Sequence, residues 1–233
     1  MEKAASIRST PALEAIGISR SFRRGAEIVP VLSEVNLELN AGELVLISGV
    51  SGSGKTTLLN LLSGLDTPDS GIVHIAGVSL KELDRRARDH LRLSGIGAVF
   101  QEPNLVPDFT SRENVELVLR AAGLGALDPA REARAALAQV GLEGLEDRHP
   151  RELSGGQAQR VGIARAIAGG KPLLLADEPT GAVDRQKSTE IFHLLKEIAD
   201  SGRAVLLSSH DPAARDQASR SYTLVDGRLE RDL

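Results

Sequence analysis

The sequence predicts an α/β fold in which a parallel sheet is covered by helices on both faces. Short apolar runs at residues 43–48, 173–176 and 204–208 are typical of buried parallel strands. An amphipathic helix lies between the last two runs, with apolar residues at i, i+3, i+4 and i+7. These positions are Ile191, Leu194, Leu195 and Ile198. Strands that alternate with helices in this way favour a parallel sheet.

The N-terminal segments favour a small antiparallel β part. Residues 1–10 are interpreted as a frayed N-terminal segment that leads into the first strand. Residues 13–18 and 35–39 alternate, or nearly alternate, between apolar and polar side chains, as half-exposed antiparallel strands do. Residues 71–75 have the pattern of a third strand of this sheet, and the turn signal at residues 66–71 leads into it.

Residues 49–56 match the phosphate-binding pattern G-x-x-x-x-G-K-[ST] at every specified position. A predicted strand precedes this loop and a good helix former (57–62) follows it. Glycines let backbone amides face phosphate oxygens, and the helix N-terminus adds positive potential. We therefore expect a nucleoside triphosphate, with Lys55 at its β- and γ-phosphates and the Thr56 hydroxyl on magnesium. The alternative, a Gly-Ser loop with a surface lysine, leaves this context unexplained. The expected contacts are Gly49, Ser51, Gly52, Ser53, Gly54, Lys55, Thr56 and Thr57.

Residues 104–165 have the character of a helical insertion. Residues 113–122 and 129–140 carry apolar side chains at helical spacing, with Gly and Pro between them. Further on, Ser154 and two glycines begin another helical pattern, which predicts a second anion-binding site. The charged stretch at residues 81–90 is interpreted as a solvated helix; a contact with lipid headgroups or a partner is the alternative.

Two carboxylates, Asp177 and Glu178, follow the apolar run at residues 173–176. Ligands of open α/β sheets bind at this end of the strands. Asp177 can hold magnesium through water, and Glu178 points differently and can polarise an attacking water. Taken alone, the pair favours an Asp-Glu-Pro turn at the surface over a functional site. The phosphate-binding loop in the same chain favours the functional interpretation.

The composition excludes several classes of function. None of the 233 residues is cysteine, so disulfides, thiolate metal sites and cysteine nucleophiles are excluded. The formal net charge is -4 with both signs interspersed, so we expect no nucleic-acid partner. No apolar run approaches the roughly 20 residues of a membrane-spanning helix, and the N-terminus lacks the apolar stretch of a signal peptide. We expect a cytoplasmic protein that reaches a membrane only through a partner.

In order along nearly the whole chain, these motifs resemble those of the nucleotide-binding subunits of ABC transporters. Residues 49–56 resemble Walker A, residues 153–157 the signature motif, and residues 173–178 Walker B with its glutamate. Four further positions resemble the glutamine loop, the histidine switch, the D-loop aspartate and the ring that stacks on adenine. They are Gln101, His210, Asp184 and Phe22.

The resemblance implies a single ABC nucleotide-binding domain over residues 1–233. It would consist of a P-loop NTPase core of the ABC ATPase type with a parallel sheet, an N-terminal antiparallel β subdomain and an inserted α-helical subdomain. The β and core parts would span about residues 11–103 and 166–233, and the helical subdomain about residues 104–165. No regulatory domain is expected after the core.

It also implies ATP hydrolysis with Mg²⁺, and a role for each residue of the site. Glu178 would be the general base, and His210 would contact the γ-phosphate. Gln101 would sense the γ-phosphate and the magnesium ion and report to a transmembrane partner. The ion itself would lie among Thr56, Gln101 and Asp177.

The family mechanism further implies a second copy of the chain. Ser154, Gly156 and Gln157 would bind the γ-phosphate of the ATP held by that copy, so two chains head to tail would complete two sites. Asp184 and Phe22 would complete the nucleotide contacts. Completion of a site in trans is worth orders of magnitude in phosphoryl transfer.

Segments around residues 64–71, 104–110 and 176–181 are similar to one branch of the family. It contains macrolide-efflux, lipoprotein-release, haem-export and antimicrobial-peptide-resistance ATPases. Permeases of this branch have four membrane helices and a large extracytoplasmic domain. We expect such a permease to dock near residues 101–107 and to hold the subunit at the cytoplasmic face of the membrane. The cargo stays open.

Two other functions share these motifs in part. An ABC ATPase that regulates cell-wall hydrolysis during division carries every one of them, and its partner alone would distinguish it. Repair-type ABC ATPases need a long heptad insertion, and translation-type ones need two cassettes; the sequence has neither.

Overall fold

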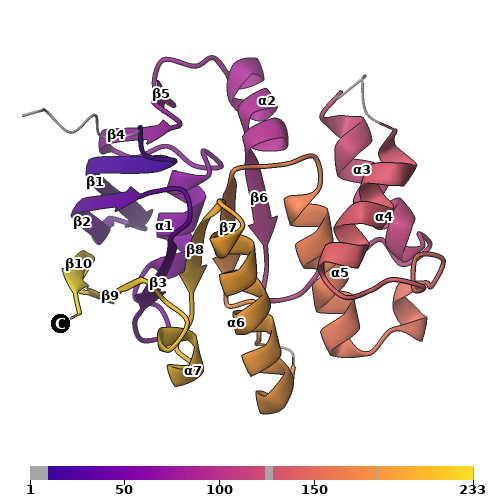
Figure 1. Ribbon diagram of the computed structural model, residues 1–233. Helices are drawn as coiled ribbons and strands as arrows, with labels where there is room; N and C mark the ends of the chain where they lie inside the picture. The colour runs from indigo at the N-terminus through magenta and orange to yellow at the C-terminus, as the bar shows by residue number, and fades with distance from the viewer. Residues whose placement is uncertain (1–9, 124–127, 182, 233) are drawn as a thin grey trace, which may run out of the picture.

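The computed structural model describes residues 10–123, 128–181 and 183–232, so the lead-in predicted for residues 1–10 lies outside the described residues except for Thr10. Its strands form two sheets, and most of its helices lie beside the larger one (Figure 1). The smaller sheet has the strand order β2-β1-β4-β5 and the larger one β10-β9-β3-β8-β7-β6.

The smaller sheet is antiparallel and contains the three strands expected near the N-terminus. It is built from β1 (Leu13–Arg24), β2 (Glu27–Leu39), β4 (Ser70–Ile75) and β5 (Val78–Ser79). Strands β1 and β2 extend well beyond the predicted segments, because their pairing continues out to Arg24 opposite Glu27. The outer part of this hairpin is largely exposed and carries a mixed polar and apolar sequence. This part of the hairpin therefore lacks the alternation of apolar and polar residues that predicts a half-buried strand.

The larger sheet is parallel except for its last pair, β9 with β10. Its strands are β3 (Leu44–Ser48), β6 (Ile96–Val99), β7 (Leu173–Asp177), β8 (Ala204–Ser208), β9 (Arg220–Val225) and β10 (Arg228–Arg231). The predicted strands at residues 43–48, 173–176 and 204–208 are confirmed.

The continuous apolar runs of β3, β7 and β8 follow from burial on both faces. Leu46 and Leu174 belong to a core shared with four helices: α3 (Ser111–Ala121), α4 (Pro129–Gln139), α5 (Gly155–Ile167) and α6 (Arg185–Asp200). Val45 and Leu173 belong to a core shared with α1 (Lys55–Leu62) and the smaller sheet. Successive side chains of a strand point to opposite faces. A strand covered on both sides is therefore apolar at every position.

Two elements depart from expectation between residues 81 and 99. Helix α2 spans Arg85–Gly95, so the helix expected over residues 81–90 was wrong at both ends. It begins at Arg85 because the Asp84 side chain accepts a hydrogen bond from the Ala87 amide at 2.8 Å. Strand β6 follows directly and was not predicted. Gly97 in β6 lies so close to α5 that a Cβ there would be 2.2 Å from the Ala166 carbonyl oxygen.

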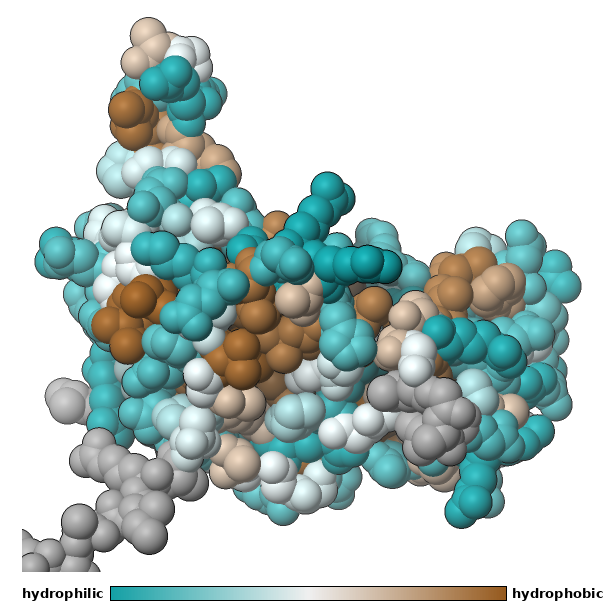
Figure 2. Space-filling model, turned by 90° about the horizontal axis from the view of Figure 1, so that it is seen from above, coloured by the Kyte–Doolittle hydropathy of each residue, from teal (hydrophilic) through white to brown (hydrophobic). Residues whose placement is uncertain are grey.

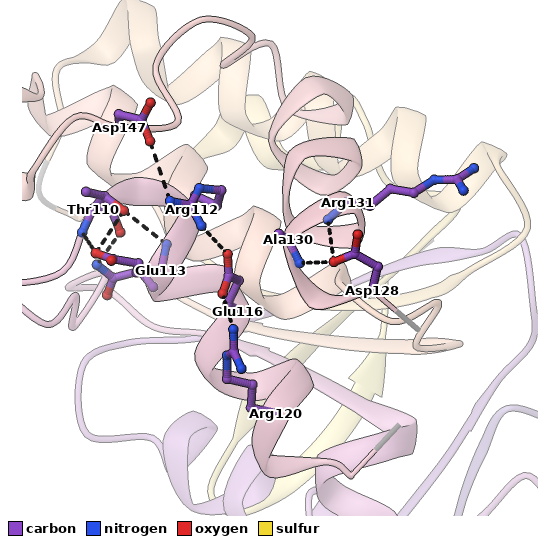
Figure 3. Close-up of polar contacts among 10 residues, drawn as sticks. Thr110, Arg112, Glu113, Glu116, Arg120, Asp128, Ala130, Arg131 and Asp147 are labelled. Carbon is purple, nitrogen blue, oxygen red and sulfur yellow. Dashed lines mark hydrogen bonds and ion pairs between the residues drawn. The ribbon is translucent and has the colours of Figure 1, made fainter. Parts of the chain in front are cut away.

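Three helices pack together beyond β6: α3 (Ser111–Ala121), α4 (Pro129–Gln139) and α5 (Gly155–Ile167), with a 3-10 turn at Pro150–Glu152 before α5 (Figure 1). Polar side chains begin both α3 and α4 (Figure 3). Thr110 and Glu113 form a capping box, and Asp128 accepts from the Ala130 amide at 3.0 Å. The two helices expected in this region are confirmed.

The two remaining helices, α6 and α7, follow strands β7 and β8. Helix α6 (Arg185–Asp200) buries Ile191, Leu194, Leu195 and Ile198 as its spacing predicts, and α7 (Pro212–Arg215) follows β8. The face seen from above mixes small brown apolar groups with teal hydrophilic ones (Figure 2). Within the described ranges, no helix combines the length and apolar character that a membrane span requires.

Candidate functional site

The predicted phosphate-binding loop connects β3 to α1. Gly49 lies at φ +151°, and a Cβ there would stand 2.9 Å from the Leu224 carbonyl oxygen. Gly54 caps α1 from the left-handed region at φ +105°, which glycine adopts without steric cost. The Ser53 hydroxyl is buried and has no hydrogen-bond partner among the described residues. The loop therefore offers amides and a free hydroxyl to an anion.

Lys55 is the first residue of α1 and is only 8% exposed. Its ammonium donates hydrogen bonds to the carbonyl oxygens of Gly49 at 2.9 Å and Val50 at 3.3 Å. The same ammonium lies 3.5 Å from Glu178 Oε1. One lysine thus connects the loop to the carboxylate predicted as the base.

Asp177 ends β7 and is held by hydroxyls from two other elements. The Thr56 hydroxyl donates to Asp177 Oδ2 at 2.7 Å, and the Ser208 hydroxyl donates to Oδ1 at 2.6 Å. Asp177 and Ser208 are brought together because they are register partners of β7 and β8. Thr56 and Asp177 present hard oxygen donors, which suit Mg²⁺. The donor set therefore fits the expected ion.

Glu178 takes an unusual backbone conformation. Its φ is +45°, in the left-handed region, and its amide donates to the Ser208 carbonyl at 3.0 Å. Left-handed backbone is uncommon for residues other than glycine and is found repeatedly at functional sites. The carboxylate Oε2 lies 3.0 Å from His210 Nδ1, and the His210 side chain is 77% exposed. The turn after β7 thus directs this carboxylate towards the histidine that follows β8.

A cavity of about 780 Å³ collects most of the predicted nucleotide-site residues. Phe22, at its edge, is 43% exposed. Gln101 lies against Gly181, where a Cβ would be 2.6 Å from the glutamine Nε2. Twelve predicted residues line this cavity: Phe22, Gly49, Ser51, Gly52, Gly54, Lys55, Thr56, Thr57, Gln101, Asp177, Glu178 and His210. Ser53 lines an adjoining hollow, which shares residues of the loop with this cavity.

The other predicted residues, around the start of α5, lie in a second hollow of about 390 Å³. Ser154 caps α5, and its side chain and that of Gln157 form a capping box. Asp184 caps α6, and its carboxylate lies 2.8 Å from the Lys187 ammonium. The hydrogen bonds and charge of Lys187 lower the pKa of Asp184. The cavity at the phosphate-binding loop and this second hollow share no lining residue.

Two residues of these sites were not predicted. The sequence assigned Ser208 only to the predicted strand at residues 204–208 and gave it no role in the site. The signal that could have indicated a role is a serine at the end of a strand that pairs with a strand ending in a carboxylate. Lys187 packs on Gly156, where a Cβ would lie 3.0 Å from the lysine Cδ. Nothing local in the sequence indicates that contact, because 31 residues separate the two.

The model of the family described as "ABC transporter" matches residues 32–181. This chain belongs to the ABC transporter family. The family assignment, together with the fold, identifies it as an ABC ATPase, which binds and hydrolyses ATP. The expected fold class, a P-loop ABC ATPase core with a parallel sheet, is confirmed. The roles of the single site residues and the subdomain boundaries stay predictions.

Curated relatives are similar to nearly the whole chain. The "Macrolide export ATP-binding/permease protein MacB 1" of Yersinia pestis bv. Antiqua (strain Antiqua) is 45% identical over 220 residues, which are 94% of this chain and 34% of the relative. The MacB protein of Salmonella typhimurium (strain LT2) is 42% identical over the same shares. The chain thus spans about a third of the length of these relatives. The match to macrolide-export proteins agrees with the expected branch, that of the macrolide-efflux, lipoprotein-release and haem-export ATPases.

Solved structures of the ATP-binding cassette MJ0796 have the same fold. One is described as a dimeric post-hydrolysis state bound to ADP and Pi; it is 38% identical, with a TM-score of 0.85, and the match covers 94% of this chain and 97% of that one. A second, described as the dimeric structure of a bacterial ABC transporter cassette, is 39% identical with the same TM-score and coverage.

Proposed function

We propose that this ABC ATPase works as a head-to-tail pair of chains that clasp ATP between them and drive a membrane permease. The observation that carries the proposal is the separation of the two hollows. One holds the phosphate-binding loop and the acidic residues, and the other holds the Ser154 turn at the start of α5. The MJ0796 structures are described as dimers, which supports a site completed by a second copy.

In each site the phosphate-binding loop would hold the triphosphate. Lys55 would exchange its carbonyl acceptors for β- and γ-phosphate oxygens, and the loop amides and the Ser53 hydroxyl would complete the cradle. Thr56 and Asp177 would hold Mg²⁺, with Gln101 at the same cavity wall. The ion neutralises charge on the phosphate oxygens when bound.

Glu178 would act as the general base. A water molecule placed between the γ-phosphate and Glu178 gives a proton to the carboxylate while its oxygen bonds to the γ-phosphorus. The bond from that phosphorus to the bridging oxygen breaks, and ADP and phosphate are formed. His210, 3.0 Å from Glu178, would fix the carboxylate and contact the γ-phosphate. Ser154, Gly156 and Gln157 of the second copy would approach from the opposite side, with Asp184 near them.

The permease would dock at residues 101–107, and two contacts of this segment support a role in coupling. Gln159 of α5 donates to the Phe100 carbonyl at 2.9 Å, and Arg165 donates to the Asn104 carbonyl at 2.9 Å. Gln101, between these anchors, lines the nucleotide cavity. A displacement of this segment by the permease would therefore move both Gln101 in the ATP site and α5, the helix that Ser154 caps.

The relatives named as ATP-binding/permease proteins are about three times as long as this match, which supports a permease of the macrolide-export type. It would have four membrane helices and a large extracytoplasmic domain. The ATPase would then lie at the cytoplasmic face of the membrane. The cargo is selected by the permease.

Complementation in trans tests the paired site. Lys55→Ala should abolish ATP binding and turnover, and Ser154→Arg should keep ATP binding but stop turnover. Each variant alone is inactive. A mixed pair still contains one intact site, formed by the loop of the Ser154→Arg chain and the turn of the Lys55→Ala chain. Mixing should therefore restore ATPase activity, and a mixture as inactive as its components would refute the pairing.

Glu178→Gln tests the base. This variant should bind ATP, lose turnover and elute as a dimer in gel filtration with ATP. Turnover near that of the unmodified chain would exclude Glu178 as the base.

A further inference from the structure

The ring of Phe22 is covered on one face by a neighbouring cation. The guanidinium carbon of Arg20 lies 5.0 Å from the centre of that ring. Both residues belong to β1, two positions apart, and a bulge in the pairing with β2 falls between Arg20 and Ser21. Phe22 stays 43% exposed and lines the nucleotide cavity. One ring face is thus occupied while the side chain still reaches the cavity.

Arg20 is itself held in place by two carboxylates. Its two terminal nitrogens each lie 2.9 Å from a carboxylate oxygen, one of Asp66 and one of Asp69, and its side chain is 23% exposed. Asp69 also accepts a hydrogen bond from the Ser21 amide at 2.7 Å. A guanidinium can form this fork and lie flat on a ring at the same time, which the ammonium of a lysine cannot do.

The carboxylates come from the loop that leaves the phosphate-binding helix. The amide of Asp66 donates to the Asn60 carbonyl of α1 at 3.1 Å, and the amide of Asp69 donates to the Ser19 carbonyl of β1 at 2.9 Å. Arg20 therefore links Phe22 to the helix whose first residues are Lys55 and Thr56. The distance between ring and phosphate loop is set by this chain of contacts.

We propose that Arg20 is a positioning residue for the base of ATP: it fixes the Phe22 ring from behind so that the opposite face stacks on adenine. This inference rests on the proposed nucleotide site. Without Arg20 the half-exposed ring would sample other rotamers, and ordering it would be a cost of binding the base. Arg20 is not among the described residues that line the nucleotide cavity, so its effect should be confined to the base.

The test compares ATP with a ligand that has phosphates and no base. Affinities for ATP and for inorganic tripolyphosphate are measured by calorimetry without divalent cations, so that nothing is hydrolysed. Arg20→Ala should weaken ATP binding by roughly three- to tenfold and leave tripolyphosphate binding unchanged. Phe22→Ala should show the same pattern. Adding Arg20→Ala to Phe22→Ala should cost nothing more, because the ring on which Arg20 acts is gone.

Two variants serve as controls. Arg23→Ala removes the same charge from an exposed position of β1, and it should leave both affinities unchanged. Arg20→Lys keeps a cation beside Asp66 and Asp69 but loses the guanidinium group over the ring, so it should reproduce the selective loss of ATP affinity in a chain whose urea midpoint is preserved.

The outcomes separate this inference from the proposed function. Equal losses for ATP and tripolyphosphate would make Arg20 a structural residue, and tighter ATP binding by Arg20→Ala would show that Arg20 blocks the ring; either result overturns the inference. If Phe22→Ala leaves ATP affinity unchanged while Lys55→Ala abolishes it, the nucleotide site stands and the inference falls. If Lys55→Ala also leaves ATP affinity unchanged, the proposed site itself is wrong.

Discussion

Glu116→Gln should destabilise the chain by removing a charge that is buried between two arginines. Glu116 is 5% exposed in α3, and its carboxylate accepts hydrogen bonds from Arg112 and Arg120 (Figure 3). The Arg120 side chain is 66% exposed, so its pair contributes at most about 0.5 kcal/mol. Arg112 is 24% exposed, and in the variant it would face a neutral amide, with one acceptor oxygen left for two arginines, in place of a carboxylate, which costs about 1.5 kcal/mol. The expected loss in the free energy of unfolding is about 2 kcal/mol.

Urea unfolding at pH 7 measures this loss, and its pH dependence identifies the cause. Burial raises the pKa of Glu116, but the hydrogen bonds and charges of Arg120 and Arg112 outweigh it, so the pKa is lowered from 4.5. A carboxylate with a lowered pKa adds stability above its unfolded pKa, and this stability is lost as the pH falls through the folded value. The difference between the two proteins should therefore shrink below pH 4.5.

The matched control is Glu190→Gln, which makes the same chemical change in a surface pair with Arg160. Glu190 is 52% exposed, so its loss should stay within about 0.5 kcal/mol. Equal urea midpoints for Glu116→Gln and the unmodified chain at pH 7 would refute the reasoning. So would a loss that does not depend on pH.

Two further substitutions test packing and burial. Burial, with the charge of Arg165, lowers the pKa of Lys171 to about 8; Lys171→Met should therefore raise the free energy of unfolding at pH 7 by about 2 kcal/mol. That gain should shrink as the pH rises from 8 towards 10.5, where the unfolded chain binds more protons than the folded one; a gain that is constant with pH would contradict it. Gly97→Ala should lower the free energy of unfolding by about 3 kcal/mol, because its Cβ would lie 2.2 Å from a backbone oxygen. Gly95→Ala, in the preceding helix with its nearest neighbour at 3.4 Å, should change stability by less than about 1 kcal/mol; similar urea midpoints for the two alanine variants would exclude the close approach.

The features that could be predicted from the sequence are those that depend on residues close together in the chain. The phosphate-binding loop, the strand that ends in Asp177 and the serine cap of α5 each lie within a few positions. Their geometry follows from local rules: glycine at positive φ, a carboxylate at a strand end, a capping side chain at a helix start. The structure places each of them at a hollow, as expected.

The features that could not be predicted depend on distant partners. Strand β6 has four residues and little pattern of its own, and it exists because β7 pairs with it. Helix α2 buries none of its residues, so nothing apolar marks its ends. Arg20 reads as a surface charge until Asp66 and Asp69, more than 40 residues later, are brought beside it. In each case the deciding contact is a tertiary one.

The position of Glu178 is set by its backbone more than by its ion pair with Lys55. Its amide is fixed on the Ser208 carbonyl, and its φ of +45° aims the side chain before any charge acts. If Lys55 turns to a triphosphate, Glu178 loses a cation 3.5 Å away but keeps the contact with His210 at 3.0 Å. Binding of the substrate would therefore end the ion pair with Lys55 and leave the Glu178 carboxylate held by its backbone and by His210, the fixed position that its proposed role as general base requires.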